Sequence, residues 1–150
     1  MTEKLSPSMF IGVQGEGIIS FGSGQPDLPP PKEVYEVLRH YSGFKYGLVQ
    51  GQINLRDALS KQYPSSTADS FVVTNGASEA LDLTLRAIAR TGSRNKNKVL
   101  LPRPYYYTYP YLVKYARMKP VYTELVEGRI DFNDFEKKVH ECKAVIINSP

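Results

Sequence analysis

The second half of the chain alternates short apolar runs with amphipathic segments. The apolar runs, at residues 71–74, 98–101, 120–125 and 144–148, have the length and residue types of strands. The segments between them place apolar residues at helical spacing and predict three helices. The first passes through Leu81, Leu85 and Ile88, the second covers about residues 107–117, and the third follows a capping Asp131 with Asp134 in the capping-box position.

Strands that alternate with helices in this way predict an α/β fold, with a mostly parallel sheet and helices on both faces. The chain stops directly after its last apolar run, so we expect the sheet to be incomplete. Ligands of such sheets bind beyond the carboxyl ends of the strands. Three places are therefore candidate sites: residues 75–78, residues 102–107, and the segment from Asn148 onward.

The first half of the chain has fewer and weaker signals. Residues 1–19 predict an irregular arm, and residues 18–21 a short extended piece. Residues 20–69 predict an N-terminal segment with two linker helices, and residues 70–150 the first half of a larger domain. Pro31 lies near the first turn of one helix, whose apolar residues are Val34, Val37, Leu38 and Tyr41; the other carries Leu55, Ala58 and Leu59, and a loop with Tyr46 joins them.

Composition narrows the class of protein. The 150 residues are 41% hydrophobic and 23% charged, as in a globular chain of about one domain. We expect no membrane segment and no secretory signal, since every apolar run is far shorter than the roughly 18 residues of a membrane span. A single cysteine, Cys142, fits a reducing cytoplasm. The net charge of +4 suits acidic small molecules, but Lys and Arg are spread along the chain, so we expect no nucleic-acid partner.

Small residues occupy the predicted strand-to-helix turn at residues 74–79. Free N–H groups at a helix start, with the positive end of the helix dipole behind them, favour a phosphate, and the Ser78 hydroxyl would add a donor. The alternative is that Asn75 or Ser78 only caps the helix. The turn is neither a Walker loop nor a GxGxxG fingerprint, which argues against nucleoside triphosphates and dinucleotides.

Tyrosines crowd the segment after the second predicted strand, Pro104-Tyr105-Tyr106-Tyr107-Thr108-Tyr109-Pro110-Tyr111. Rings at the carboxyl end of a strand can stack on a planar heterocycle. The alternative, which we favour for most of them, is that they pack between helix and sheet. One ring that faces the pocket would be enough for stacking.

Five motifs resemble, in order, those of class I/II aminotransferases, the pyridoxal-phosphate-dependent enzymes of fold type I. They are Gly24 with Pro26-Asp27, Lys45-Tyr46-Gly47 with Gly51 and Leu55-Arg56, the turn at residues 73–81, the tyrosine segment at 104–110, and the final Ile146-Ile147-Asn148-Ser149-Pro150. The resemblance covers residues 19–150. It implies pyridoxal 5'-phosphate as cofactor, an amino acid and a 2-oxo acid as substrates, and a homodimer.

The resemblance also implies roles for single residues. Gly76, Ala77 and Ser78 match the turn that holds the cofactor phosphate, and Tyr106 matches the aromatic residue that stacks on the pyridine ring. Tyr46 matches the tyrosine that reaches the cofactor phosphate of the partner subunit. Gly24 matches the backbone position against the substrate. Arg56 and Arg103 match no such role and are interpreted as surface or structural charges.

The family's chemistry needs residues that these 150 positions do not supply. The Asn-Pro-Thr-Gly-like turn, the aspartate at the pyridine nitrogen, the carboxylate-binding arginine and the Schiff-base lysine all lie downstream in the family. Ser60-Lys61 is the only Ser-Lys pair, and its place on an amphipathic helix makes it a poor substitute. We therefore assign no catalytic residue and no metal site. The chain is expected to be an N-terminal half that does not turn over alone and that a C-terminal half would complement.

Other interpretations remain open. Decarboxylases, lyases and synthases share the fold. A non-catalytic ligand-binding domain, as in some transcription regulators, is a further alternative, although residues 1–19 are too few for a winged helix. In the family's sheet the strand at 71–74 lies beside the last strand, which this chain lacks. We also expect an open apolar edge at residues 145–147 and poor solubility as a result.

Overall fold

The computed structural model describes residues 15–19, 21, 26, 28–92 and 95–148. The chain forms two compact units, Met1–Lys45 and Tyr46–Pro150. Gly24, the predicted substrate-contacting glycine, lies outside the described residues. No helix in the described ranges is long and apolar enough to cross a membrane.

Helix α1, Lys32–His40, is the only regular element among the described residues of the first unit. Pro31 precedes it, Glu33 lies in its first turn, and Arg39 and His40 lie in its last turn. These charges complement the helix dipole, and the predicted helix is confirmed. No residue of α1 is buried, so its apolar stripe is uncovered.

Helix α2, Ile53–Ser60, and the short 3₁₀ helix η2, Ala68–Ser70, are joined by a buried arginine. Arg56 is only 3% exposed. Its guanidinium donates to the carbonyl oxygens of Gly51 at 3.2 Å and Ala68 at 2.9 Å, and it pairs with Asp69 at 3.3 Å. Arg56 is therefore a structural charge: it ties the loop before α2 to the turn after it.

The strand predicted at residues 71–74 does not form. The segment is extended, but its only backbone hydrogen bond to another segment runs from the Val73 N–H to the Gln50 carbonyl at 2.9 Å. Gly51 has φ +101°, and a Cβ there would lie 2.5 Å from the Val73 side chain, so only glycine allows this approach. The prediction was wrong because a strand needs a neighbouring strand, and none of the described strands lies beside this segment.

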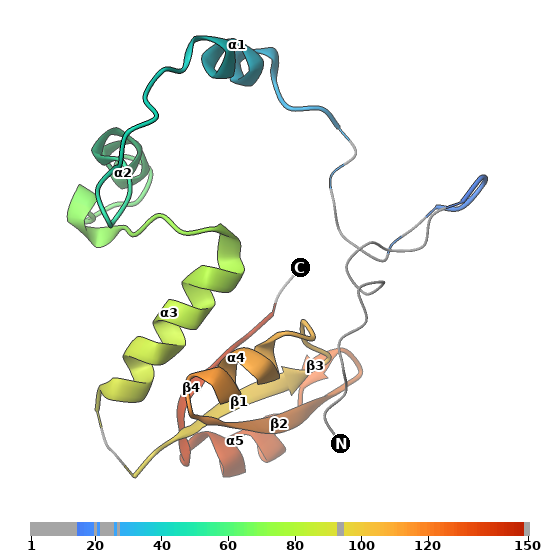
Figure 1. Cartoon of the computed structure of the whole chain (residues 1–150). Coiled ribbons are helices and arrows are strands. Elements are labelled where there is room, and N and C mark those ends of the chain that lie inside the picture. Colours follow the sequence, from blue (N-terminus) through green and yellow to red (C-terminus); the bar gives the residue numbers. More distant parts are fainter. Residues whose placement is uncertain (1–14, 20, 22–25, 27, 93–94, 149–150) are drawn as a thin grey trace. The chain divides into compact units, whose positions relative to one another are not determined.

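Four strands form one sheet in the order β3-β2-β1-β4 (Figure 1). Strand β1, Lys98–Arg103, pairs in parallel with β2, Lys119–Val126, and with β4, Cys142–Val145. Strand β3, Arg129–Ile130, pairs antiparallel with β2. The predicted α/β fold with a mostly parallel sheet is confirmed. Strand β4 ends earlier than predicted, although the Ile146 N–H still donates to the Leu100 carbonyl.

Strand β3 was not predicted from the sequence. Glu127 and Gly128 form the two-residue loop between β2 and β3, and both have positive φ. This is the backbone of a type I′ hairpin turn, which usually carries Asn-Gly or Asp-Gly. The hairpin was missed because Glu at the first loop position is a weak turn signal.

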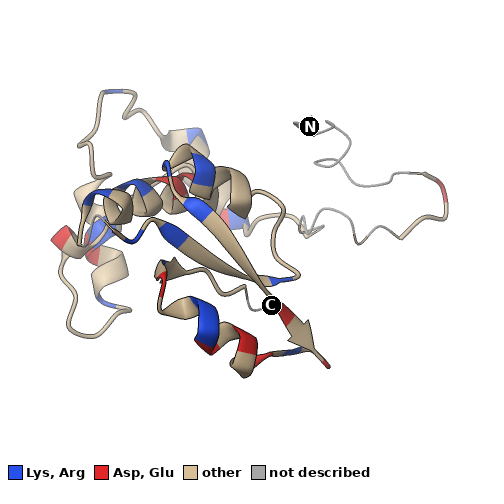
Figure 2. Ribbon diagram, turned by 90° about the horizontal axis from the view of Figure 1, so that it is seen from below, with Lys and Arg blue, Asp and Glu red and all other residues tan. Residues whose placement is uncertain are grey.

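Three helices cover the two faces of the sheet. Helices α3, Gly76–Arg90, and α4, Tyr109–Tyr115, lie on one face, and α5, Phe132–Val139, lies on the other (Figure 1). Helix α4 is shorter than the predicted segment of about residues 107–117. Lys and Arg occur on several helices and strands in Figure 2, as predicted from their spread in the sequence.

The start of α5 confirms one half of its predicted cap. The Asp131 carboxylate accepts the N–H groups of Asn133 and Asp134. The reciprocal half of the capping box is wrong, because the Asp131 N–H donates to the Glu124 carbonyl instead. The Asp134 carboxylate binds the Thr123 hydroxyl at 2.8 Å and the Lys138 ammonium at 2.7 Å, and these bonds lower its pKa below the ordinary value.

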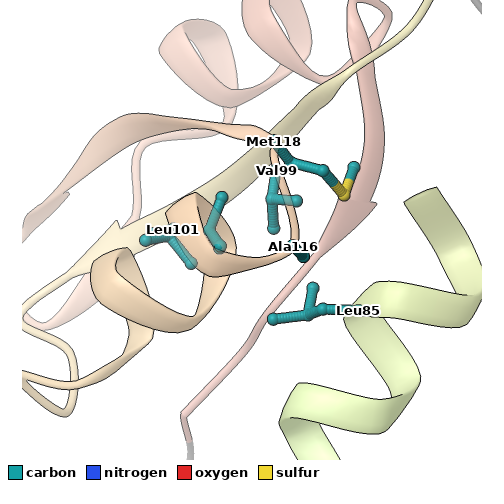
Figure 3. Close-up of a cluster of buried hydrophobic side chains, with 6 residues drawn as sticks. Leu85, Val99, Leu101, Ala116 and Met118 are labelled. Atoms are coloured by element: carbon teal, nitrogen blue, oxygen red, sulfur yellow. The ribbon is translucent and has the colours of Figure 1, made fainter.

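The hydrophobic core lies between β1 and the helices α3 and α4 (Figure 3). Its buried members are Leu85, Val99, Leu101, Val113, Ala116 and Met118. Leu100, between two core residues of β1, is also fully buried, and its side chain points to the opposite face because successive strand residues alternate. Strand β1 is therefore buried on both faces, as central parallel strands usually are.

Strand β4 is at one edge of the sheet, as predicted, and the chain stays apolar from its last residue, Val145, to Ile147. Val145 and Ile146 are half-buried and Ile147 is 64% exposed. We predict that Ile147→Lys reduces self-association of the 150-residue chain, because a charge on an exposed edge opposes strand addition. Light scattering of the purified chain at increasing concentration measures this.

The matched control is Val126→Lys, at an exposed apolar position at the end of β2, a strand that lies between β1 and β3 and not at the sheet edge. The edge accounts for the aggregation only if Ile147→Lys lowers scattering much more than Val126→Lys. Equal effects of both substitutions would show that net charge alone controls solubility.

Candidate functional site

The first candidate site is the start of α3. Gly76 has φ +73°, a backbone conformation that L side chains rarely adopt, and open space surrounds the position where a Cβ would lie. Gly76, Ala77 and Ser78 are all exposed. The first N–H groups of a helix have no acceptor within the helix, so these three small residues leave the positive end of α3 accessible to an anion.

The helix start is capped by a residue that sequence reasoning missed. Asn75 makes no side-chain capping bond. Instead the Glu79 carboxylate accepts the Asn75 N–H, and the Thr74 hydroxyl donates to the Gly76 carbonyl at 3.0 Å. The sequence signal that could have predicted this cap is Glu79, an acidic residue in the first turn of the helix. The alternative that Asn75 only caps the helix is thus not what the structure shows.

The second candidate site is the tyrosine segment between β1 and α4. Tyr105 stacks on Tyr122 with ring centroids 5.6 Å apart. Tyr109 is half-buried, and its hydroxyl donates to the Asn148 side-chain carbonyl at 2.8 Å. These rings pack within the fold, as predicted for most of the tyrosines.

Tyr106 differs from its neighbours because its side chain is 43% exposed. Its ring contacts Tyr107 at 4.6 Å and meets the edge of Tyr109 at 5.7 Å between centroids. The two neighbouring rings hold the Tyr106 ring from one side and leave part of it open. A ring fixed in this way is suited to stack on a planar ligand.

Both candidate sites face the same edge of the sheet. Tyr106 follows β1 and therefore lies at the carboxyl end of that strand. The Lys143 ammonium, at the amino end of β4, donates to the Ala89 carbonyl near the end of α3, which places the end of α3 at the amino edge. The start of α3 consequently points toward the carboxyl edge, where α/β proteins bind their ligands.

The remaining predicted residues are placed differently. The Tyr46 side chain is fully exposed, in the loop that begins the second unit. Arg103 lies on the surface, with its guanidinium 4.1 Å from the centroid of the Tyr122 ring and paired with Glu124 at 3.0 Å. Within the described part of the chain, no group of three or more His, Cys, Asp or Glu is suited to a metal.

Comparison with known proteins adds a finding that geometry alone does not provide. The profile of the family described as "Aminotransferase class I and II" matches residues 16–150. The chain belongs to this family. The class I and II aminotransferases are pyridoxal-phosphate-dependent enzymes, so the family resemblance, the enzyme class and the cofactor inferred from the sequence are confirmed.

Individual relatives agree with the family match. The chain is 32% identical over 150 residues to the "Probable aspartate/prephenate aminotransferase" of Aquifex aeolicus, and 27% identical over 148 residues to the aspartate aminotransferase of Bacillus subtilis. Each alignment covers 91% of this chain and 37% of the relative. The chain thus spans little more than a third of the length of these aminotransferases.

A solved structure shows the same relation. The aspartate aminotransferase from Thermus thermophilus with maleate superposes with a TM-score of 0.75 at 27% sequence identity. The superposition covers 86% of this chain and 36% of that one. The fold observed here is therefore part of the aminotransferase fold.

The tyrosine pair at the carboxyl edge gives a prediction about ionisation. A hydrogen bond with Tyr106, together with burial, raises the pKa of Tyr107 to about 12. We predict that Tyr106→Phe lowers the pKa of Tyr107 toward 10, because the largest cause of the shift is removed. Ultraviolet difference titration against Tyr107→Phe, performed in each background, isolates this phenol from the other tyrosines.

The same shift makes stability depend on pH. A phenol whose pKa is higher in the folded chain stabilises the fold below pH 10, and that contribution is lost as the pH rises through about 12. An unchanged pKa of Tyr107 in the Tyr106→Phe variant would contradict the assignment.

Proposed function

We propose that the chain is the N-terminal part of an aminotransferase that transfers an amino group between an amino acid and a 2-oxo acid. The observation that carries the proposal is the open start of α3 at the same sheet edge as the partly exposed Tyr106 ring. The family match and the names of the relatives, several of them aspartate aminotransferases, support an amino-acid substrate.

The residues at the start of α3 fit a phosphate ester. Ala77 and Ser78 are exposed and present N–H groups at the start of the helix, and the Ser78 hydroxyl is a further donor. Gly76 leaves open space where a Cβ would lie, while its own N–H donates to the Thr74 carbonyl at 2.9 Å. We assign these three residues to the phosphate of pyridoxal 5'-phosphate. The cofactor supplies an electron sink for the substrate carbon when it is bound; the chain's part is to hold and orient it.

Tyr106 is assigned to the pyridine ring of the cofactor. Its own ring is held by Tyr107 and Tyr109, so little side-chain freedom is lost when a ligand stacks on it. The hydrogen bond between Tyr109 and Asn148 fixes the neighbouring ring to the segment after β4. Tyr106 thus restricts the cofactor to one plane while the phosphate is held at α3.

Several assignments depend on parts outside this edge. We propose a homodimer in which Tyr46 reaches the cofactor phosphate of the partner subunit, consistent with a tyrosine that is fully exposed in the single chain. Gly24 is assigned to the substrate. We propose a division of the chain into three parts: an arm at residues 1–19, a segment at 20–69, and the first half of the cofactor-binding domain at 70–150. We also propose that the protein is cytoplasmic.

The chemical step needs an amine that these residues do not place at the site. Lys61, in the only Ser-Lys pair, follows the end of α2 and is exposed. We propose that a C-terminal half supplies the lysine, either as further residues of the same protein or as a separate chain. The 150 residues alone then bind the cofactor without steady-state transamination.

The phosphate assignment predicts opposite effects of two neighbouring substitutions. Ser78→Ala removes a donor and should weaken binding of pyridoxal 5'-phosphate about fivefold, the value of one hydrogen bond. Glu79→Gln removes a negative charge from the same helix end while an oxygen remains to accept the Asn75 N–H, and should strengthen binding about two- to fivefold. Isothermal titration calorimetry of the 150-residue chain measures both.

The matched control for the charge change is Glu136→Gln, an exposed position on α5. Binding that is insensitive to Ser78→Ala and Glu79→Gln, or equally sensitive to Glu136→Gln, would contradict the assignment of the phosphate to α3.

A further inference from the structure

A hollow lies at the amino edge of the sheet, opposite the candidate cofactor site. It has a volume of about 460 Å³ and lies where α3 and α4 end and β1, β2 and β4 begin. Its apolar floor includes Ala116 and Met118, which are buried core residues. No acidic residue lines it among the described residues, whereas five cationic ones do: Arg86, Arg90, Lys96, Arg117 and Lys143.

These cations come from separate segments of the chain. Arg86 and Arg90 belong to α3, Lys96 precedes β1, Arg117 is in the turn between α4 and β2, and Lys143 is in β4. Arg86, Arg90 and Lys96 are close in sequence, in a basic stretch that is typical of a solvated loop, whereas Arg117 and Lys143 are distant, so the charge pattern did not predict a basic site. The parallel sheet gathers them, because the amino ends of its strands and the ends of the preceding helices share one edge.

Two of the five have partners that explain their position. Arg86 pairs with Asp82 at 2.7 Å, and the Lys143 ammonium donates to the Ala89 carbonyl at 3.3 Å. Arg90, Lys96 and Arg117 form no ion pair within the described residues. Outside the lining, Lys98 is paired with Glu141.

Helix dipoles account for part of the remaining charge. A cation at a helix end stabilises it, and Arg90 in the last turn of α3 and Arg117 directly after the C-cap of α4 both have that role. Arg117 also adopts φ +60°, a left-handed conformation in which glycine would be favoured, and Lys96 is at no helix end. Three cations without partners around one hollow repel one another, and a like-charged concave surface attracts anions.

We propose that this hollow binds the polyphosphate group of a small molecule, through Arg90, Lys96 and Arg117. Guanidinium groups bind phosphate oxygens in bidentate fashion, and several neighbouring phosphates match the several unpaired charges. The hollow is distinct from the candidate cofactor site, because Ser78 and Arg90 lie near opposite ends of α3, about 18 Å apart along the helix at roughly 1.5 Å per residue.

The test is calorimetric titration of the 150-residue chain with sodium tripolyphosphate and with ATP. The double variant Arg90→Gln and Arg117→Asn should bind tripolyphosphate at least about tenfold more weakly, since it removes two charge-assisted hydrogen-bond donors; asparagine tolerates the left-handed turn at residue 117. A control double variant, Arg129→Gln and Lys137→Gln, removes the same charge from exposed positions elsewhere and should bind almost as tightly as the unchanged chain.

Each outcome decides the proposal. Equal losses in both double variants, no binding below millimolar tripolyphosphate, or displacement by pyridoxal 5'-phosphate would overturn it. Equal affinity for tripolyphosphate and ATP supports the polyphosphate group alone as the ligand. Tighter binding of ATP that Tyr115→Leu removes supports a nucleoside polyphosphate, because the Tyr115 ring at the rim is 67% exposed. Circular dichroism verifies the fold of each variant, and Arg90→Gln alone replaces the double variant if that one unfolds.

Discussion

Burial of β1 between two parallel neighbours is the constraint on which the second unit depends. Val99, Leu100 and Leu101 are fully buried, and each buried aliphatic side chain contributes roughly 1.5–3 kcal/mol. Alternation along the strand directs Val99 and Leu101 to α3 and α4, and Leu100 to the other face. Because β2 and β4 run parallel to β1, the helices on both faces must run back in the opposite direction.

This polarity gives the sheet two chemically different edges. At the carboxyl edge, the start of α3 presents N–H groups and small residues, and Tyr106 follows the end of β1. At the amino edge, α3 and α4 end among lysines and arginines. Glu79 at one end of α3 and Arg90 at the other complement the same helix dipole. The proposed cofactor site and the proposed polyphosphate site are thus opposite ends of one arrangement, and each can be altered without the other.

Features set by neighbouring residues were predictable from the sequence, and features set by distant ones were not. The helix through Leu85 and the Asp131 cap follow from local spacing, and both are confirmed. The predicted strand at residues 71–74 does not form, because a strand needs a neighbouring strand and none of the described strands lies beside this segment. Arg56 gave no local sign that it would bind carbonyl and carboxylate oxygens at residues 51, 68 and 69. The residue pattern of the tyrosine segment did not favour one ring over the others; the family resemblance named Tyr106, and the structure leaves its side chain partly exposed.

The central claim is that the 150 residues carry the phosphate-binding and ring-stacking elements of an aminotransferase at one sheet edge. Hydrogen–deuterium exchange of the chain with and without pyridoxal 5'-phosphate tests this most directly. The account predicts that the cofactor slows exchange at the first turn of α3 and in the tyrosine segment after β1, and leaves α5 unchanged. Slower exchange at the amino edge alone, or no change at the start of α3, would contradict it.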